Sequence, residues 1–323
     1  ESFPQMKYEE MQAEDNMSTV IQFALPGFSD LPNRQGILFG VFTITYIIIL
    51  IGSSLLIIIT WLDPALHKPT YFFLANFSFL EICYVPDILP RILVNLWTQD
   101  RSISVLDCAT QVCFFLMLEA TECFLLAVMT YDRCVAICDP LHYPLVMIPK
   151  TCLQLTVGSW VSGIPVQIGQ RCQISLHFCH SNEISHFFCD IPPILKLACG
   201  DTFAHELSVY AVALLFVAVP FMLILSSYSK IISTILRFPT ARGGRKKTFS
   251  TCASHLTSVA IYQGTLLFVY SRPSYLYSPN TDKIISVFYT IIIPVRNPLI
   301  YSLRNKDVKD AAKKVLKPKI NSS

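Results

Sequence analysis

Apolar residues gather in seven long blocks along the chain, and most polar or charged residues fall between them. Each block has about 20 residues or more, which as a helix rising 1.5 Å per residue spans a hydrocarbon core of about 30 Å. The pattern predicts an all-α membrane fold, a seven-transmembrane helix bundle. The expected spans are residues 36–62, 70–91, 106–131, 151–169, 207–228, 249–270 and 284–303.

The composition strengthens this interpretation. Of 323 residues, 53% are hydrophobic and only 15% are charged, whereas a soluble domain carries about 25% charged residues. We expect an N-terminal tail over 1–34, the bundle over 35–303, and an inner amphipathic helix and tail over 304–323. The polar and acidic stretch 1–31 has no cleavable signal pattern, so the first span is expected to act as the targeting signal. No nucleic-acid partner is expected.

The distribution of positive charge predicts the orientation. Seven spans place the termini on opposite sides, and the side that holds the C-terminus carries sixteen of the 25 Lys and Arg residues against eight on the other, with Arg296 inside a span. Positive residues gather on the cytoplasmic side of membrane proteins. We therefore expect a multi-pass plasma-membrane protein with an extracellular N-terminus, where Asn16 begins a glycosylation sequon, and a cytoplasmic C-terminus.

Cysteines divide between the two sides. Cys108 starts the third span at its outer end, and the outer loop after the fourth span holds Cys172, Cys179, Cys189 and Cys199. An oxidising outer face permits disulfides there. A metal site with the nearby histidines is the disfavoured alternative, because disulfides would consume the thiols, and no metal is expected. The remaining seven, Cys83, Cys113, Cys123, Cys134, Cys138, Cys152 and Cys252, are expected to be free.

After Asn305, apolar residues recur at spacings of three and four among lysines, which predicts an amphipathic helix on an anionic membrane surface. Membrane lipid is thus an expected partner, and a merely solvated basic tail is the alternative. Near the end of the third span, Asp132 and Arg133 form a candidate switch: a paired Arg is held, and a released Arg offers five donors to a partner. The alternative is an ion pair that anchors the helix end.

Five motifs follow one another along the chain. They are Leu66 to Leu74, Met129 to Cys138, Ser227-Tyr228, Lys247 to Leu256, and Asn297 to Asn305. Together they resemble the olfactory (odorant) receptors of class II, the tetrapod type, which are rhodopsin-like G-protein-coupled receptors. The resemblance covers roughly residues 28–316.

The resemblance implies roles for individual residues. Arg133 would engage the G protein, Asp132 would restrain it, and Tyr228 and Tyr301 would rearrange beside it, with His255 in the same activation region. The G protein would be the stimulatory olfactory type, which raises cyclic AMP. The remaining implied positions are the polar core of Glu81 and Glu122, which can hold a sodium ion, and the disulfides Cys108–Cys189 and Cys179–Cys199.

The ligand, a small odorant, is expected in an apolar cleft in the outer half of the bundle. Glu119 is the best candidate contact, where a carboxylate would favour a basic or strongly hydrogen-bond-donating odorant. The alternative is a protonated Glu119 that bonds a neighbouring helix. Further candidates are Leu118, Phe115, Tyr262, Gln263 and Thr265, with 209–213 as the segment of the fifth span.

Some positions depart from the family pattern, notably Ser53, Cys134, Gln263 and Arg296. A charge inside the seventh span costs about 2.5–3.5 kcal/mol unless it is paired or hydrated. We therefore expect Arg296 to face the core and to approach Glu81 or Glu122.

Three other classes fit less well. A transporter often shows inverted repeats, and none is visible here. A retinal-type light receptor needs a lysine in the seventh span, and 284–303 contains none. The acids of the second and third spans form no catalytic set, so no enzyme is expected. A peptide or amine receptor of the same fold is the nearest alternative, and the long loop with four cysteines favours the odorant branch.

Overall fold

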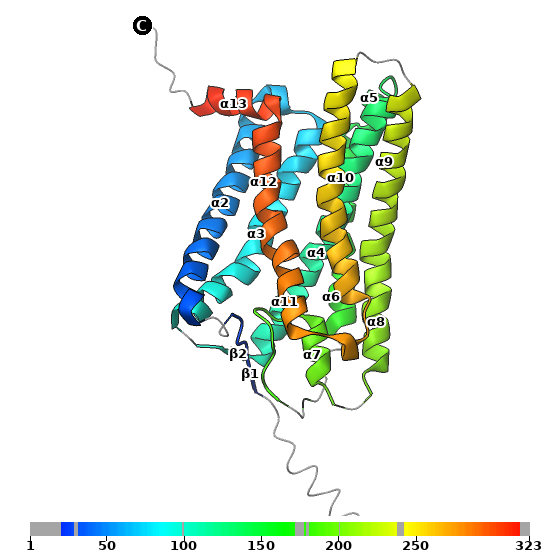
Figure 1. Cartoon of the computed structure of the whole chain (residues 1–323). Coiled ribbons are helices and arrows are strands. Elements are labelled where there is room, and N and C mark those ends of the chain that lie inside the picture. Colours follow the sequence, from blue (N-terminus) through cyan, green and yellow to red (C-terminus); the bar gives the residue numbers. More distant parts are fainter. Residues whose placement is uncertain are drawn as a thin grey trace, which may run out of the picture.

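The computed structural model describes residues 21–28, 32–98, 100–171, 178, 181–199, 201–237 and 242–316 (Figure 1). Asn16, Cys172 and Cys179 lie outside these ranges. Tyr301 lies in a described helix, but its side chain is outside the described set, as are those of 167–171, 242–251, 254, 274, 300–304, 306 and 315–316.

Seven helical columns form the bundle, as the hydrophobic pattern predicts. Four are uninterrupted helices on the N-terminal side: α2 (Gln35–Leu62), α3 (Pro69–Thr98), α4 (Val105–Cys138) and α6 (Pro149–Arg171). The fifth joins α8 (Phe203–Ala213) to α9 (Val219–Arg237), the sixth is α10 (Arg242–Tyr270), and the seventh joins α11 (Pro279–Val287) to α12 (Ile293–Arg304). Within the described chain, α2, α3, α4 and 203–237 are each long and apolar enough to cross a membrane.

Short elements complete the two ends of the bundle. They are the strands β1 (Gln22–Ala24) and β2 (Ser102–Ser104), the short helices α5 (Tyr143–Val146), α7 (Ile191–Leu197) and α13 (Lys306–Leu316), and 3-10 turns at Pro32–Arg34, Pro64–Leu66 and Ser274–Leu276.

Two columns contain a wider π-helical turn, at Leu214–Ala218 and at Phe288–Ile292. Each turn ends just before a proline, Pro220 or Pro294. A proline ring lacks an N–H and clashes with the carbonyl four residues earlier, which here is that of Phe216 or Thr290, inside the wide turn. The π turn therefore relieves the proline clash without breaking the column.

The central column is α4, which packs against α3, α6 and α9. Small residues allow two close approaches between columns. A Cβ on Gly163 of α6 would lie 2.6 Å from the Met117 carbonyl oxygen of α4, and one on Gly52 of α2 would lie 3.1 Å from Pro298 of α12. These two glycines set how closely their helices can pack.

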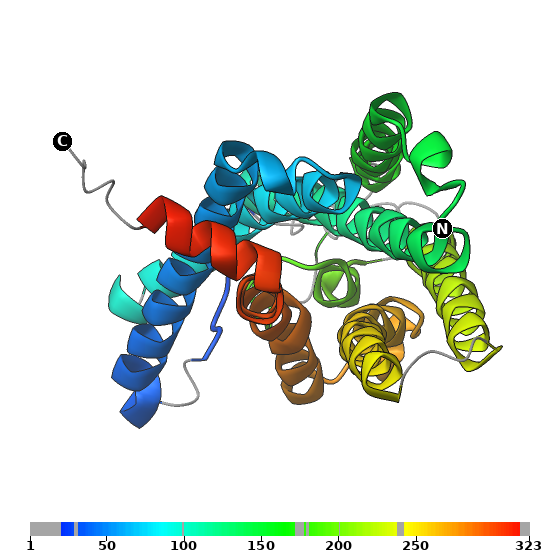
Figure 2. The ribbon, with the colours of Figure 1, turned by 90° about the horizontal axis from the view of Figure 1, so that it is seen from above.

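The helix α13 lies across one end of the bundle (Figure 2). Its Val308 and Ala311 are buried, and Lys309, Lys313 and Lys314 are exposed. The predicted amphipathic helix is therefore present. This end of the molecule is called the α13 end below.

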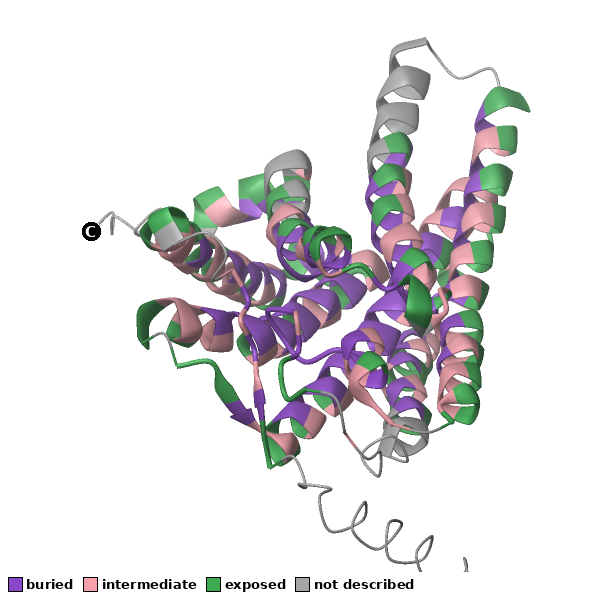
Figure 3. Ribbon diagram, turned by 60° about the horizontal axis from the view of Figure 1, so that its bottom comes forward, coloured by how far each residue is buried: buried purple, intermediate pink, exposed green. Residues whose placement is uncertain are grey.

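The opposite end is closed by a cap made from residues 21–28 and 181–199, and buried residues reach from the bundle up to it (Figure 3). In the cap, β1 pairs antiparallel with β2, and Ala24 bridges to Glu183. The structure contains the Cys108–Cys189 disulfide that the resemblance implies, which ties the cap to α4. This end is called the cap end.

The third column runs further than the sequence predicted. The apolar block was expected to end at residue 131, but α4 continues to Cys138. Only Asp132 and Arg133 interrupt the apolar sequence, since 134–138 are again apolar, and helical hydrogen bonds satisfy the backbone of the charged pair. Asp132 and Arg133 consequently lie within the helix and not at its end.

Candidate functional site

A cavity near the cap end lies among α4, α6, α7, the fifth column and α10. Its walls are mostly aliphatic, and its volume is only about 20 Å³. The lining residues from the fifth column are Val209, Val212, Ala213, Phe216 and Val217; the others are Leu116, Glu119, Ala120, Val166, Ile191 and Tyr270. Three residues of the segment 209–213 thus line this cavity, and its role in ligand binding stays a prediction.

Glu119 forms the polar part of this cavity. Its side chain is buried at 4% exposure, and its Oε1 has no hydrogen-bond partner among the described residues. The carboxylate of Asp190 is near enough to interact with it electrostatically. A buried carboxyl oxygen without a partner costs free energy, so this position favours a ligand that supplies a donor.

At the cap side of the cavity, Asp190 joins the cap to the sixth and seventh columns. Its Oδ1 accepts hydrogen bonds from the Tyr270 hydroxyl at 2.8 Å and from the Ile191 N–H at 2.8 Å, and its Oδ2 accepts one from the Tyr289 hydroxyl at 3.3 Å. Burial raises the pKa of this loop carboxyl to about 6, although these three donors oppose the rise.

The network continues through a serine to a histidine of the cap. The hydroxyls of Tyr289 and Ser286 lie 2.8 Å apart, and Ser286 Oγ lies 3.1 Å from His186 Nε2. Burial, together with the neighbouring Lys283, lowers the pKa of His186 to about 3. His186 is therefore neutral at physiological pH, and its hydrogen bond with Ser286 is one between uncharged groups.

The other predicted ligand residues lie around this cavity or on its α13 side. Phe115 packs against Phe188 of the cap, with ring centroids 5.1 Å apart, and Leu118 is buried. The Thr265 hydroxyl donates to the Tyr262 carbonyl at 2.7 Å. Of the six predicted contacts only Glu119 lines the cavity, because the pattern of one helix does not show which neighbour covers each face.

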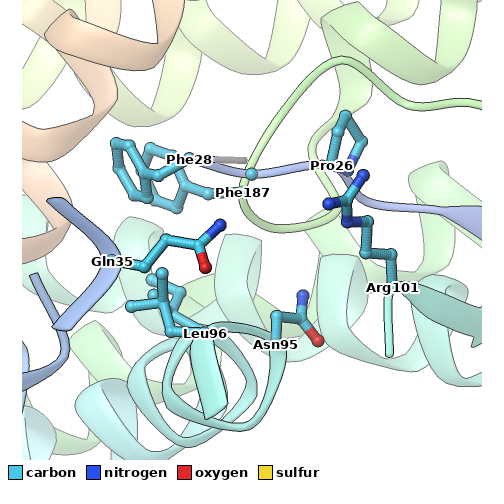
Figure 4. A pocket seen from close by; sticks show the side chains of 9 residues that line it. Pro26, Phe28, Gln35, Asn95, Leu96, Arg101 and Phe187 are labelled. Carbon is cyan, nitrogen blue, oxygen red and sulfur yellow. The ribbon is translucent and has the colours of Figure 1, made fainter. Parts of the chain in front are cut away.

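A second hollow lies at the edge of the cap, between the N-terminal segment, α2 and α3 (Figure 4). Phe28 stacks on Phe187 with centroids 5.2 Å apart and planes at 17°. Gln35, Asn95 and Arg101 give the remaining wall polar groups. Its lining includes neither Glu119 nor a residue of the fifth, sixth or seventh column, so we do not assign the odorant to this hollow.

On the α13 side of the first cavity, a polar core connects the second, third and seventh columns. Asn297 Nδ2 donates to Glu81 Oε1 at 2.6 Å. Glu81 Oε2, Glu122 Oε1 and Ser53 Oγ are buried and have no hydrogen-bond partner within the described ranges. Hard oxygen atoms of this kind fit a small cation, so these residues are suited to a sodium ion.

Tyr262 and Gln263 belong to this polar core and not to the cavity near the cap end. Tyr262 and Glu122 line one narrow hollow together with His255 and Asn297. The Gln263 amide lies beside the Cys123 thiol. The two residues therefore extend the polar core toward α10.

The expectation for Arg296 is wrong in this structure. Its side chain is half-buried, and within the described chain no ion pair joins it to Glu81 or Glu122. Asn297, the next residue, takes the core-facing position instead. Adjacent residues on a helix point about 100° apart, so both cannot face Glu81.

At the α13 end, the expected pairing of Asp132 with Arg133 is also absent from the described ion pairs. The buried Asp132 carboxylate instead accepts hydrogen bonds from Thr70 Oγ1 at 2.6 Å and from the Tyr143 hydroxyl at 2.8 Å. Adjacent residues on a helix diverge, so these partners come from α3 and α5. Asp132 thereby fixes three elements together, while Arg133 lies near His255 and Tyr71.

The fifth and sixth columns are joined close to Arg133. The Tyr228 hydroxyl lies 2.5 Å from His255 Nδ1, and both side chains are buried. The predicted activation residues Asp132, Arg133, Tyr228 and His255 thus lie near one another on the third, fifth and sixth columns, toward the α13 end.

The seven-helix bundle, with its cavity at the capped end, has the architecture of a G-protein-coupled receptor. Comparison with known proteins gives the family. The sequence profile described as "Olfactory receptor" matches residues 42–319, and the chain belongs to the olfactory receptor family. It is not an enzyme.

Named relatives cover almost the whole chain. It is 54% identical to human olfactory receptor 10AG1 over 92% of this chain and 98% of the relative. It is 53% identical to human olfactory receptor 5I1, over 95% and 98%, and 52% identical to the dog olfactory receptor-like protein OLF1, over 95% and 99%. The family is that of odorant-sensing, G-protein-coupled receptors of the plasma membrane.

Proposed function

We propose that a small odorant with an amine or another strong hydrogen-bond donor binds in the cavity that Glu119 shares with the fifth column. The supporting observation is the buried Oε1 of Glu119, which lacks a described partner at the polar end of an aliphatic cavity. A donor on the odorant would satisfy this oxygen, and its apolar body would pack on Val209, Val212 and Phe216.

The cavity must widen to admit such a ligand. Its volume of about 20 Å³ is far below the roughly 300–1,000 Å³ of small-molecule sites. The odorant therefore favours an expanded form in which the fifth and sixth columns move apart. It shifts the population only by the difference between its affinities for the two forms.

The expanded form would act on the stimulatory, olfactory-type G protein and raise cyclic AMP. Movement of the sixth column would separate His255 from Tyr228 and uncover Arg133, whose guanidinium would bind a helix of the G protein. The excess of Lys and Arg supports a cytoplasmic α13 end and an extracellular cap. A sodium ion at Glu81, Glu122 and Ser53 would stabilise the closed form by occupying otherwise unpartnered oxygens.

The test is cyclic AMP in cells that express the chain, over amines, alcohols, aldehydes and acids, with Glu119→Gln in parallel. We expect amines to lead and Glu119→Gln to weaken their response. Responses only to neutral odorants, unchanged in Glu119→Gln, would refute the role of Glu119. An odorant response that survives deletion of the stimulatory G protein would refute the proposed coupling.

A further inference from the structure

A large hollow lies outside both the odorant cavity and the activation cluster. It has a volume of about 710 Å³ and lies at the α13 end, where α2, α3 and α6 meet. Its wall includes Trp61 of α2, Tyr71 and Phe72 of α3, Met147 just after α5, and Cys152 and Leu153 of α6. We call it the α2–α3–α6 groove.

The groove faces away from the centre of the bundle. Trp61 is 80% exposed and Leu153 is 57% exposed, and α6 lies at the periphery of the bundle (Figure 2). In a membrane protein, an apolar face on the outside of the bundle is in contact with lipid. The occupant that the surroundings supply is therefore a membrane lipid.

The rim of the groove is basic. His67 and Lys68 line it and are exposed. Nε2 of His67 lies 3.1 Å from the carbonyl oxygen of Trp61, near the end of α2. Lys68 is therefore the cation left to face a ligand. Asp63, five residues before Lys68, accepts a hydrogen bond at 3.3 Å from Lys314 on α13, and its other oxygen accepts from the Ala65 N–H. Asp63 thus does not neutralise Lys68.

We propose that the α2–α3–α6 groove binds one phospholipid with an anionic headgroup, with an acyl chain against Phe72 and Leu153 and the phosphate at Lys68. A lipid tail gains little from the hydrophobic effect when it moves from the bilayer into an apolar groove, because both surroundings are apolar. Selectivity must then come from the headgroup, and a lysine near the surface contributes the attraction to negative charge. A zwitterionic headgroup would gain much less from Lys68.

The bound lipid would touch the elements that hold the receptor closed. Tyr71 lines the groove, and its hydroxyl donates to Asp307 of α13 at 2.9 Å. Its neighbour Thr70 holds Asp132. A lipid wedged between α3 and α6 would therefore restrict both the start of α3 and the position of α13.

The experiment is lipid titration of the purified full chain in detergent, followed by native mass spectrometry, with phosphatidylglycerol and phosphatidylcholine of identical acyl chains. We expect the parent to prefer phosphatidylglycerol, and Lys68→Gln to reduce that preference about fivefold, the effect of about one lysine at a membrane surface. Leu153→Trp, which fills the groove without changing charge, is expected to reduce binding of both lipids.

The matched control is Lys230→Gln, the same loss of charge at an exposed position on α9, which is expected to keep the preference. Equal losses in Lys68→Gln and Lys230→Gln would overturn the site, since the attraction would then be general. A Leu153→Trp variant that binds like the parent would also overturn it. Binding of cholesterol that needs the groove, with no anionic preference, would replace the proposed ligand. None of these readouts needs an odorant, so they stand apart from the signalling proposal.

Discussion

The two hydrogen bonds on Asp132 give the sharpest prediction about activation. Tyr143→Phe removes the hydroxyl that donates to Asp132 Oδ1 at 2.8 Å and leaves the ring in place. Burial and the Asp132 carboxylate raise the pKa of Tyr143, so its hydroxyl keeps its proton and remains a donor. A hydrogen bond to a charged group contributes about 1.5–3 kcal/mol. Tyr143 is only half-buried, so the lower figure applies, which is about a tenfold change in an equilibrium constant.

If α3 and α5 hold Asp132 only in the closed form, the open population rises by that factor. The assay is basal cyclic AMP without odorant, at matched surface expression, with Thr70→Val as the second variant that removes a donor to Asp132. Tyr131→Phe is the control, because Tyr131 is 42% exposed on the same helix. We expect raised basal signalling in the first two variants. Basal signalling in Tyr143→Phe no higher than in Tyr131→Phe would refute the reasoning.

Three other predictions concern stability. Gly163→Ala should lower the melting temperature, because its Cβ would lie 2.6 Å from a backbone oxygen and overpacking costs about 1–3 kcal/mol, whereas Gly158→Ala on the same helix meets open space and should be neutral or stabilising. Asp190, with its pKa raised to about 6, contributes stability that is present below about pH 4 and lost as pH rises through 6. Between pH 4 and 6 the parent should therefore lose about 1.4 kcal/mol of stability per pH unit relative to Asp190→Asn, and the melting temperature of the variant relative to the parent should rise. A difference in melting temperature that does not change with pH would contradict this. Replacing Cys108 and Cys189 together with Ser should reduce the fraction of receptor at the cell surface, since a bridge over 81 residues contributes about 4.5 kcal/mol by chain entropy, and surface expression equal to the parent would count against it.

The columns of the fold could be predicted because each span carries its own signal. An apolar block of membrane length specifies a helix without reference to its neighbours, and the 3–4 spacing after Asn305 likewise specified α13. The ends of the helices were less predictable, since α4 continues through the charged pair Asp132-Arg133 and ends only at Cys138.

The site was predicted less completely because it depends on pairs of helices. Glu119 was identified by its charge within an apolar block, but the aliphatic wall of Val209, Val212 and Phe216 resembles any other membrane helix. The partners of Asp132 were missed for the same reason. Thr70 and Tyr143 lie 62 and 11 residues away in sequence, and only the packing of α3 and α5 on α4 brings them to the carboxylate.

The position of the odorant is tested most directly by narrowing its cavity. Ala213 is buried and lines the cavity, and Ala211 is exposed on the same helix. The measurement is the concentration of an active odorant that gives half the maximal cyclic AMP response in Ala213→Leu and in Ala211→Leu, at matched surface expression. We predict a higher concentration or no response for Ala213→Leu and the parent value for Ala211→Leu. Parent values for both variants would contradict odorant binding in this cavity.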